Sequence, residues 1–268
     1  MSYLTLGSVW KNENYYAIDF FKYHRSVGVD KFIILDREYS ELKELTKNMP
    51  DVEIIHFPDI PENNHMSAWN KLILLNKGKT KFLALIDADQ CLVPVAKNSI
   101  KDILKDYEDF ASIQINWHSF GSSMKKIREP GSLYERFLLR AKDDCVLNVH
   151  TQFICQPDRV LDNCPEPHYV VAMDNEVCVN TKKEQITSNK TVELNPNTPL
   201  SFNVPALHDI MYVAHYLSKS EEEAKERRAR GRCDIFGVHM PEDKWQREDN
   251  ICNDVFDDFI FNIWKNIK

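Results

Sequence analysis

The sequence lacks the short motifs that mark several large enzyme classes. It has no G-x-x-x-x-G-K-[ST] phosphate loop, no G-x-G-x-x-G turn, no G-x-S-x-G elbow and no H-E-x-x-H zinc motif. Each of these motifs places backbone amides, a nucleophile or metal ligands where its chemistry needs them. Their absence argues against a P-loop enzyme, a dinucleotide-dependent enzyme, a serine hydrolase and a zinc protease.

Other missing features restrict the setting of the protein. No apolar run is long enough to cross a bilayer, and the first ten residues hold neither a basic leader nor a sustained apolar stretch. The seven cysteines are scattered without a C-x-x-C pair, which argues against a disulfide framework or a structural zinc site. The net charge of −7 argues against binding nucleic acid through bulk charge. We therefore expect a cytoplasmic protein with reduced thiols and no transmembrane segment, and leave its oligomeric state open.

Strand-like and helix-like segments alternate through the first half of the chain. Four short apolar runs predict strands: 3–9, 31–35, 52–57 and 82–86. Segments with helical spacing or helix boundaries lie between them: 14–27, 41–48 and 62–77. Gly28 follows the first of these helices and is a good helix stop. The alternation predicts an α/β fold with a parallel or mixed sheet flanked by helices.

The second half is less regular. Strands are predicted at 110–117 and 146–154, and helices at 132–140, 218–230 and along the C-terminal apolar stripe 256–267. The polar, Pro- and Asn-rich stretch 179–205 predicts a loop or lid. No composition shift marks a domain boundary, so we expect a single domain, with a nucleotide-binding half at 1–105 and an acceptor-side half at 106–268.

Two aspartates, Asp87 and Asp89, directly follow the apolar strand at 82–86. Ligands of open α/β sheets bind beyond the carboxyl ends of the strands. Mg²⁺ and Mn²⁺ prefer a few carboxylates and fill their shell with water and phosphate oxygens. The pair therefore predicts a metal site, with a solvated turn as the alternative reading because Asp-x-Asp is common by chance.

Polar residues follow the first two strands as well. Asn12 and Glu13 come after the strand at 3–9, and Asp36 follows the strand at 31–35. These groups can hydrogen-bond a ribose or a pyrimidine, or they can cap and start the next helix. Both readings stay open from the residues alone.

Two further clusters combine aromatic or basic side chains with hydroxyls. The run from Trp117 to Ser123 can form a sugar-binding edge, or it can be core aromatics followed by a turn. His215 and Lys219 lie before the helix at 218–230 or at its start, where they can reach a metal and a phosphate. The alternative is a structural histidine followed by an exposed charged helix with i,i+4 pairs such as Glu223–Arg227.

Taken in order, these segments resemble the glycosyltransferases of family 92, which belong to the wider family 2-like GT-A group. The resemblance rests on the following motifs: Lys11-Asn12-Glu13, the run 20–30, Ile33-Ile34-Leu35-Asp36, Asp87-Ala88-Asp89, Trp117 with Phe120-Gly121-Ser122-Ser123, Glu135-Arg136-Phe137, His215-Tyr216 with Ser218-Lys219-Ser220, and Arg230-Gly231. It runs from about residue 8 to about residue 232. It implies a GT-A fold and transfer of a hexosyl or deoxyhexosyl group from a nucleotide diphosphate donor, with UDP as the nucleotide, and a role in polysaccharide biosynthesis.

The resemblance also implies roles for single residues. The nucleotide-binding residues would be Asn12, Glu13, Asp36, Asp87 and Lys219. A Mn²⁺ or Mg²⁺ ion would bind Asp89 as its main ligand, with Asp87 and His215. The acceptor side would be edged by Trp117, His118, Phe120, Gly121 and Ser122.

For the chemistry we expect inverting transfer to a glycan or other hydroxyl acceptor, with a carboxylate as the base. Glu135 and Asp174 are candidates by position, and an ion pair between Glu135 and Arg136 is the structural alternative. Family members often carry an acid and an aromatic after the Asp-x-Asp, whereas this chain has Gln90 and Cys91. That departure leaves open a decayed transferase that only binds a nucleotide or glycan. A metal-dependent nucleotidyltransferase is disfavoured, because the loop after the first strand is not Gly-rich.

Overall fold

The computed structural model describes residues 1–186, 202–233, 236–241 and 243–268. Within these ranges the strands join into one 11-stranded sheet. The parallel part consists of β3 (Val52–His56), β2 (Lys31–Asp36), β1 (Ser2–Trp10) and β4 (Thr80–Leu85). The sheet continues through the antiparallel β8 (Thr151–Cys155) to β6 (Ser112–Phe120), and then to β7 (Leu139–Arg140) and β11 (Val255–Phe256).

Two strands branch from β6, and a third pairs with one of them. β10 (Met211–Tyr216) runs parallel to it and pairs on its other side with the antiparallel β5 (Gln90–Pro94). β9 (Cys178–Asn180) pairs with the start of β6. Because β5 follows β4 directly in the chain, the β5–β10 pairing brings the second half of the protein against the end of β4.

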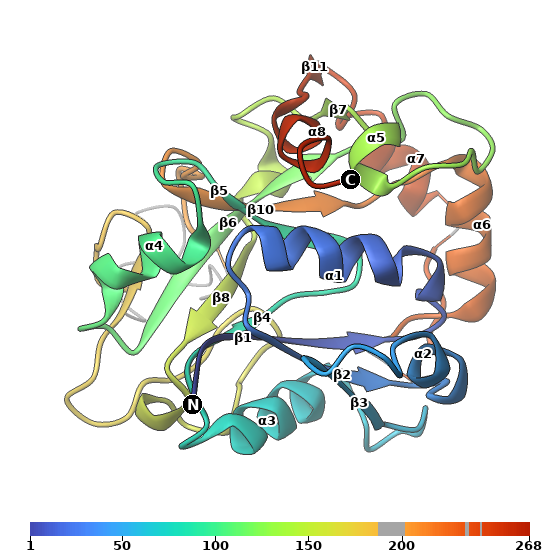
Figure 1. Cartoon of the computed structure of the whole chain (residues 1–268). Coiled ribbons are helices and arrows are strands. Elements are labelled where there is room, and N and C mark those ends of the chain that lie inside the picture. The colour runs from blue at the N-terminus through green and yellow to red at the C-terminus, as the bar shows by residue number, and fades with distance from the viewer. Residues whose placement is uncertain (187–201, 234–235, 242) are drawn as a thin grey trace.

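Helices cover both faces of this sheet (Figure 1). They are α1 (Ala17–Ser26), α2 (Ser40–Leu45), α3 (His65–Asn76), α4 (Ile100–Leu104), α5 (Leu133–Arg136), α6 (Glu221–Arg230), α7 (Lys244–Asp249) and α8 (Phe259–Trp264). Short 3-10 helices occupy Asn14–Tyr16, Lys105–Tyr107, Val146–Val149 and Pro157–Arg159. No helix of the described ranges combines the length and the apolar character that crossing a membrane requires.

Alternating side chains of the parallel strands build two cores. Phe32 and Ile34 of β2 join Phe21 of α1 in the larger core, whereas Ile33 and Leu35 point to the opposite face and join the α3 side of the sheet. This is the period-2 alternation of a strand that is buried on both faces. Each fully buried aliphatic or aromatic side chain contributes about 1.5–3 kcal/mol, so the two cores hold the sheet rigid at the end where the parallel strands stop.

The predicted α/β, single-domain architecture is confirmed, and the alternation of the first half matches the structure closely. The second half differs in detail. The predicted helix at 132–140 ends at Arg136 and turns into β7, and the predicted strand at 146–154 begins as a 3-10 helix. At the C-terminus the helix covers Phe259–Trp264, while Phe256 lies in β11 with 65% of its surface exposed. Within the predicted loop at 179–205, residues 187–201 lie outside the described ranges, and the first residues belong to β9. Because one sheet runs through both halves, their division at 105 stays a prediction.

Candidate functional site

A cavity of about 460 Å³ opens at the carboxyl ends of β1 and β4. Segments from both halves of the chain line it. From the first half come Lys11 and Glu13 after β1, His65 of α3, and Asp87 and Asp89 after β4. From the second half come Trp117 of β6, His215 of β10, Arg227 and Arg230 of α6, and the loops that hold His150 and His168. In Figure 1, α6 stands beyond the ends of the parallel strands, and its residues Arg227 and Arg230 line that side of the cavity. The position is the one that the strand–helix pattern predicts for a ligand site.

Asp89 lies at the centre of the charged part of the cavity and is 3% exposed. Its Oδ1 is 3.5 Å from His215 Nε2, and its Oδ2 is 2.9 Å from Arg227 Nη1. The β5–β10 register pairs Gln90 with His215, which sets the imidazole beside the aspartate. Burial alone would raise the pKa of Asp89, but the Arg227 guanidinium, with His215 and Lys219, lowers it well below its usual value. Asp89 is therefore a carboxylate at neutral pH.

Asp87 is held by a different set of partners. Its Oδ1 lies 3.4 Å from His65 Nε2. The side-chain amide of the buried Gln90 accepts a hydrogen bond from the Asp87 backbone N–H at 3.1 Å and donates one to Asp87 Oδ2 at 3.2 Å. A glutamate at position 90 could not donate the second bond. Gln90, the departure from the family pattern, thus clamps the turn that presents the two aspartates.

The donor atoms of Asp89 and His215 fit a metal ion in their chemistry. Both ring nitrogens of His215 and Oδ2 of Asp89 are buried without a hydrogen-bond partner, since Arg227 does not align with that oxygen as a hydrogen bond. Buried polar atoms of this kind are normally satisfied by a ligand, an ion or water. The donor atoms around Asp89 converge less closely than those of a second group. In the part of the chain that the structure describes, that second group is His118, Asp143 and His208, whose donor atoms lie within 4.8 Å of one another.

A cluster of cations lies beside Asp89. Glu13 pairs with Lys219 at 3.1 Å and with Arg230, and both Glu13 and Lys219 are buried. Burial would raise the pKa of Glu13, but Lys219 and Arg230 lower it, so the carboxylate stays ionised. Arg227 also lies close enough to Asp87 and Glu248 to feel their charges. We call Lys219, Arg227 and Arg230 the cationic cluster. Its ammonium and guanidinium groups can bind an anionic ligand.

The opposite wall is aromatic and uncharged. The Trp117 ring meets His215 edge-on at 4.2 Å and stacks on His150 at 4.8 Å between ring centroids. His168 packs edge-on against the same indole at 5.3 Å. Burial lowers the pKa of both His150 and His168 to about 4, so their imidazoles are neutral near pH 7. An indole face with neutral imidazoles around it suits the C–H surface and hydroxyls of a sugar.

The structure brings five of the sequence-predicted site residues to the cavity: Glu13, Asp87, Asp89, Trp117 and His215. Asn12 and Lys219 line an adjacent cavity of about 270 Å³, which also contains Glu13. Asp36 is fully buried and accepts a hydrogen bond from the Tyr39 backbone N–H at 2.6 Å, which shapes the turn after β2. Its contact with a nucleoside stays a prediction.

Four predicted acceptor-side residues do not line the cavity. His118 follows Trp117 in β6, so its side chain points to the other face of the sheet. Phe120 packs against Tyr216 in the core. Gly121 lies so close to the Cys252 carbonyl that a Cβ would sit 2.4 Å from it, and the Ser122 hydroxyl hydrogen-bonds a buried carboxylate of α7. Gly121 and Ser122 thus anchor the C-terminal segment.

The two predicted catalytic carboxylates also lie outside the lining. Glu135 forms the capping box of α5 with Ser132 and pairs with Lys268 at 2.6 Å. Asp174 is exposed in the loop after the 3-10 helix Pro157–Arg159. The expected alternative, an ion pair between Glu135 and Arg136, is replaced by a buried pair between Arg136 and Glu223 at 2.7 Å.

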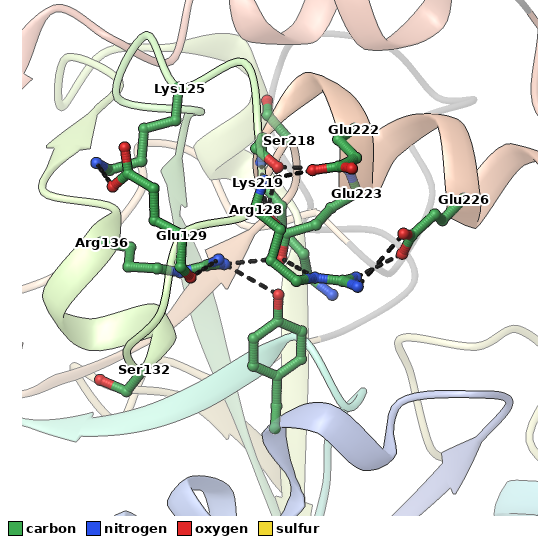
Figure 2. Close-up of polar contacts among 12 residues, drawn as sticks. Lys125, Arg128, Glu129, Ser132, Arg136, Ser218, Lys219, Glu222, Glu223 and Glu226 are labelled. Carbon is green, nitrogen blue, oxygen red and sulfur yellow. Dashed lines mark hydrogen bonds and ion pairs between the residues drawn. The ribbon is translucent and has the colours of Figure 1, made fainter.

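That buried pair belongs to a network that fixes α6 (Figure 2). Arg136 Nη2 donates to Glu223 Oε1 at 2.7 Å and to the Tyr16 hydroxyl at 3.0 Å. Arg128 pairs with Glu226 at 2.5 Å. Glu223 also completes a capping box with Ser220 at the start of α6. Because Arg128 and Arg136 hold the acids on one side of α6, Arg227 and Arg230 of its later turns point into the cavity.

The sequence pattern missed several cavity residues. The alternative reading put the charged side chains of this helix on an exposed face, yet Arg227 and Arg230 line the cavity. Their i,i+3 spacing, which places them on one face of the helix, was the available signal. His65, His150 and His168 are single histidines with no local pattern, and nothing in the sequence marks them.

Comparison with known proteins places the chain in a family. The model of glycosyltransferase family 92 matches residues 6–225. No curated protein matches the chain. Among solved structures, S. aureus TarS 1–349 is similar at 11% identity and a TM-score of 0.35, covering 58% of this chain and 47% of that one. A mycobacterial protein has 10% identity and a TM-score of 0.35, over 59% and 54%.

A CMP:2-keto-3-deoxy-manno-octonic acid synthetase complexed with CTP has 8% identity and a TM-score of 0.29, over 46% and 54%. The chain thus spans about half the length of these structures. Likenesses this weak say nothing about activity. The family match is much more extensive and agrees with the GT-A arrangement of a mixed, mostly parallel sheet flanked by helices. The chain belongs to glycosyltransferase family 92.

Proposed function

We propose that this protein transfers a sugar from a uridine diphosphate donor to a glycan hydroxyl, with inversion at the anomeric carbon and with Mn²⁺ or Mg²⁺ as cofactor. One observation carries the proposal. Buried donor atoms of Asp89 and His215 that make no hydrogen bond stand beside the cationic cluster, in a cavity at the ends of β1 and β4. A cation site next to ammonium and guanidinium groups fits the diphosphate of a nucleotide sugar.

The residues divide into donor and acceptor roles. Asp89 and His215 would hold the divalent cation, with Asp87 next to them, and the bound ion would neutralise charge on the departing diphosphate. Arg227 and Arg230 would bind phosphate oxygens, because guanidinium groups match their geometry. The other nucleotide-binding residues proposed from the sequence, Asn12, Glu13, Asp36 and Lys219, would lie along the nucleoside and the diphosphate.

The acceptor would lie against the aromatic wall. Trp117 lines this wall, and the neutral His150 and His168, which pack against its ring, would offer nitrogens to the sugar hydroxyls. The base must lie in the cavity, within hydrogen-bond reach of the attacking hydroxyl. Glu135 and Asp174 do not line it, so we assign the base to Glu166, which lines the cavity near His168.

The alternative is a decayed transferase that binds a nucleotide or glycan without turnover. Gln90 is the observation that favours it, because an acid is lost from the family pattern. Its role as a clamp on Asp87 argues that the site is maintained. A nucleotidyltransferase is less favoured, since the loop after β1 carries the acid Glu13 among the cations rather than a Gly-rich turn.

Nucleotide release separates these functions. A panel of UDP-, GDP- and TDP-sugars, tested with and without Mn²⁺, should give release and thermal stabilisation with UDP-sugars only when Mn²⁺ is present. Asp89→Ala should abolish both. Stabilisation without release, even with a range of glycan acceptors, would indicate the decayed binder. Equal responses of wild type and Asp89→Ala to metal and donor would show that the site is misassigned.

A further inference from the structure

A second group of ligand-type side chains lies on the face of β6 that points away from the cavity. His118 belongs to β6, Asp143 follows β7, and His208 precedes β10. One donor atom from each lies within 4.8 Å of the other two. Three segments that are far apart in sequence thus converge on one point, and none of these residues takes part in the proposed sugar transfer.

His118 is the unsatisfied member of the group. It is 4% exposed, and neither of its ring nitrogens has a hydrogen-bond partner. Its Nε2 lies 3.3 Å from Asp143 Oδ1. Leaving buried polar atoms without a partner costs about 1–3 kcal/mol. A neutral imidazole has a lone pair that can bind a ligand.

The other two members are oriented by neighbours. His208 Nε2 lies 2.8 Å from the Trp117 carbonyl oxygen. A carbonyl only accepts, so Nε2 carries the proton and Nδ1 keeps its lone pair. Arg140 donates to Asp143 Oδ1 at 2.8 Å. Histidine and carboxylate ligands of metals are typically fixed by such outer hydrogen bonds.

The donor set selects a class of ion. Two imidazoles and one carboxylate suit Zn²⁺ or Co²⁺, with water as a fourth ligand, better than Mg²⁺, which prefers oxygen ligands. The two rings are stacked, with centroids 4.1 Å apart and planes at 2°. Parallel rings cannot both point a lone pair at one ion, so one ring must turn. His118 makes no hydrogen bond that would oppose this rotation.

We propose that His118, Asp143 and His208 bind one transition-metal ion of the Zn²⁺ class, which ties β6 to the segments after β7 and before β10. This site is separate from the one proposed at Asp89 and His215, and it does not depend on the transferase activity. Through the His208 hydrogen bond to the Trp117 carbonyl, the bound ion would also hold the backbone behind the aromatic wall of the cavity.

Metal titration of the chelator-treated protein tests the proposal. Calorimetry with Zn²⁺ alone should show one tight site per chain in the wild type, and Co²⁺ should give the visible absorption of a four-coordinate site. Asp143→Asn should weaken Zn²⁺ binding at least about tenfold. Asp144→Asn is the matched control, because both aspartates are exposed neighbours on the same segment, and it should bind as the wild type does. Asp89→Asn should also retain the Zn²⁺ site.

His118→Gln should abolish the Co²⁺ spectrum. If that buried substitution prevents folding, the exposed Asp143→Asn decides alone. The proposal is overturned if the wild type shows no such site, if Asp143→Asn binds Zn²⁺ as tightly as Asp144→Asn does, or if Asp89→Asn removes the tight site.

Discussion

Replacing Glu223 by Gln tests how the charged network positions α6. The substitution keeps the size of the side chain and its place in the capping box with Ser220, but removes the negative charge opposite Arg136. Removing one partner of a buried ion pair costs about 3–5 kcal/mol, because the other charge stays buried without compensation. Arg136 keeps hydrogen bonds to the Tyr16 hydroxyl and the Glu129 carbonyl. Burial raises the pKa of Glu223 to about 7, so its carboxyl is only partly ionised at neutral pH. At pH 8, where it is mostly ionised, we therefore expect the lower end, a loss of about 3 kcal/mol.

With an unfolding entropy of about 2.1 cal/mol/K per residue, that loss lowers the Tm by about 5 °C. Glu226→Gln is the matched control, since Glu226 also pairs with an arginine, Arg128, but is 52% exposed at its side chain. It should cost about 1 kcal/mol or less. Thermal and urea unfolding followed by circular dichroism measure both variants. Equal losses for the two would refute the view that burial makes the Arg136–Glu223 pair important.

Three further predictions concern the cavity. Gln90→Glu replaces the amide that lies 3.2 Å from Asp87 by a second carboxylate. Without metal, the Tm of this variant should be lower than that of the wild type, and saturating Mn²⁺ should raise it more. An unchanged metal-free Tm would contradict the role of Gln90 in holding Asp87. His150 and His168 have folded-state pKa values of about 4, below the usual ~6.5. The unfolded chain therefore binds more protons between these values, and stability should fall as the pH drops from about 6.5 to 4. In His168→Gln the dependence of Tm on pH should be shallower than in the wild type. An equal slope in the two proteins would contradict this role of His168. Glu166→Gln should lower kcat by about 10²–10⁴-fold at an unchanged Tm if Glu166 is the base, and full activity would exclude that role.

The first half of the fold could be predicted from the sequence because its strands carry continuous apolar runs between helix boundaries. β5 and β10 were missed for a physical reason. Both are fully buried, yet Gln90 and His215 interrupt their apolar pattern, and they are stabilised by pairing with strands distant in sequence. Hydrophobic periodicity cannot report pairing of this kind.

Position also explains what was predicted of the site. Asp87 and Asp89 were predicted because they follow a recognisable strand, and ligands of such sheets bind beyond the strand ends; both line the cavity, and their roles stay a prediction. Trp117 also lines the cavity, whereas its neighbour His118 does not, because successive residues of a strand point to opposite faces. The group of His118, Asp143 and His208 was overlooked because the expectation about zinc was based on cysteine spacing alone. Its members meet only in three dimensions.

Binding of Mn²⁺ in the presence of UDP tests the central claim most directly. Titration calorimetry should show one Mn²⁺ site per chain in the wild type, and Asp89→Asn and His215→Gln should each lose it. Asp143→Asn should keep this site, because Asp143 belongs to the other proposed metal group. Loss of the site in both cavity variants, with retention in Asp143→Asn, is the predicted result. Undiminished Mn²⁺ binding by Asp89→Asn would contradict the assignment of the nucleotide-sugar site.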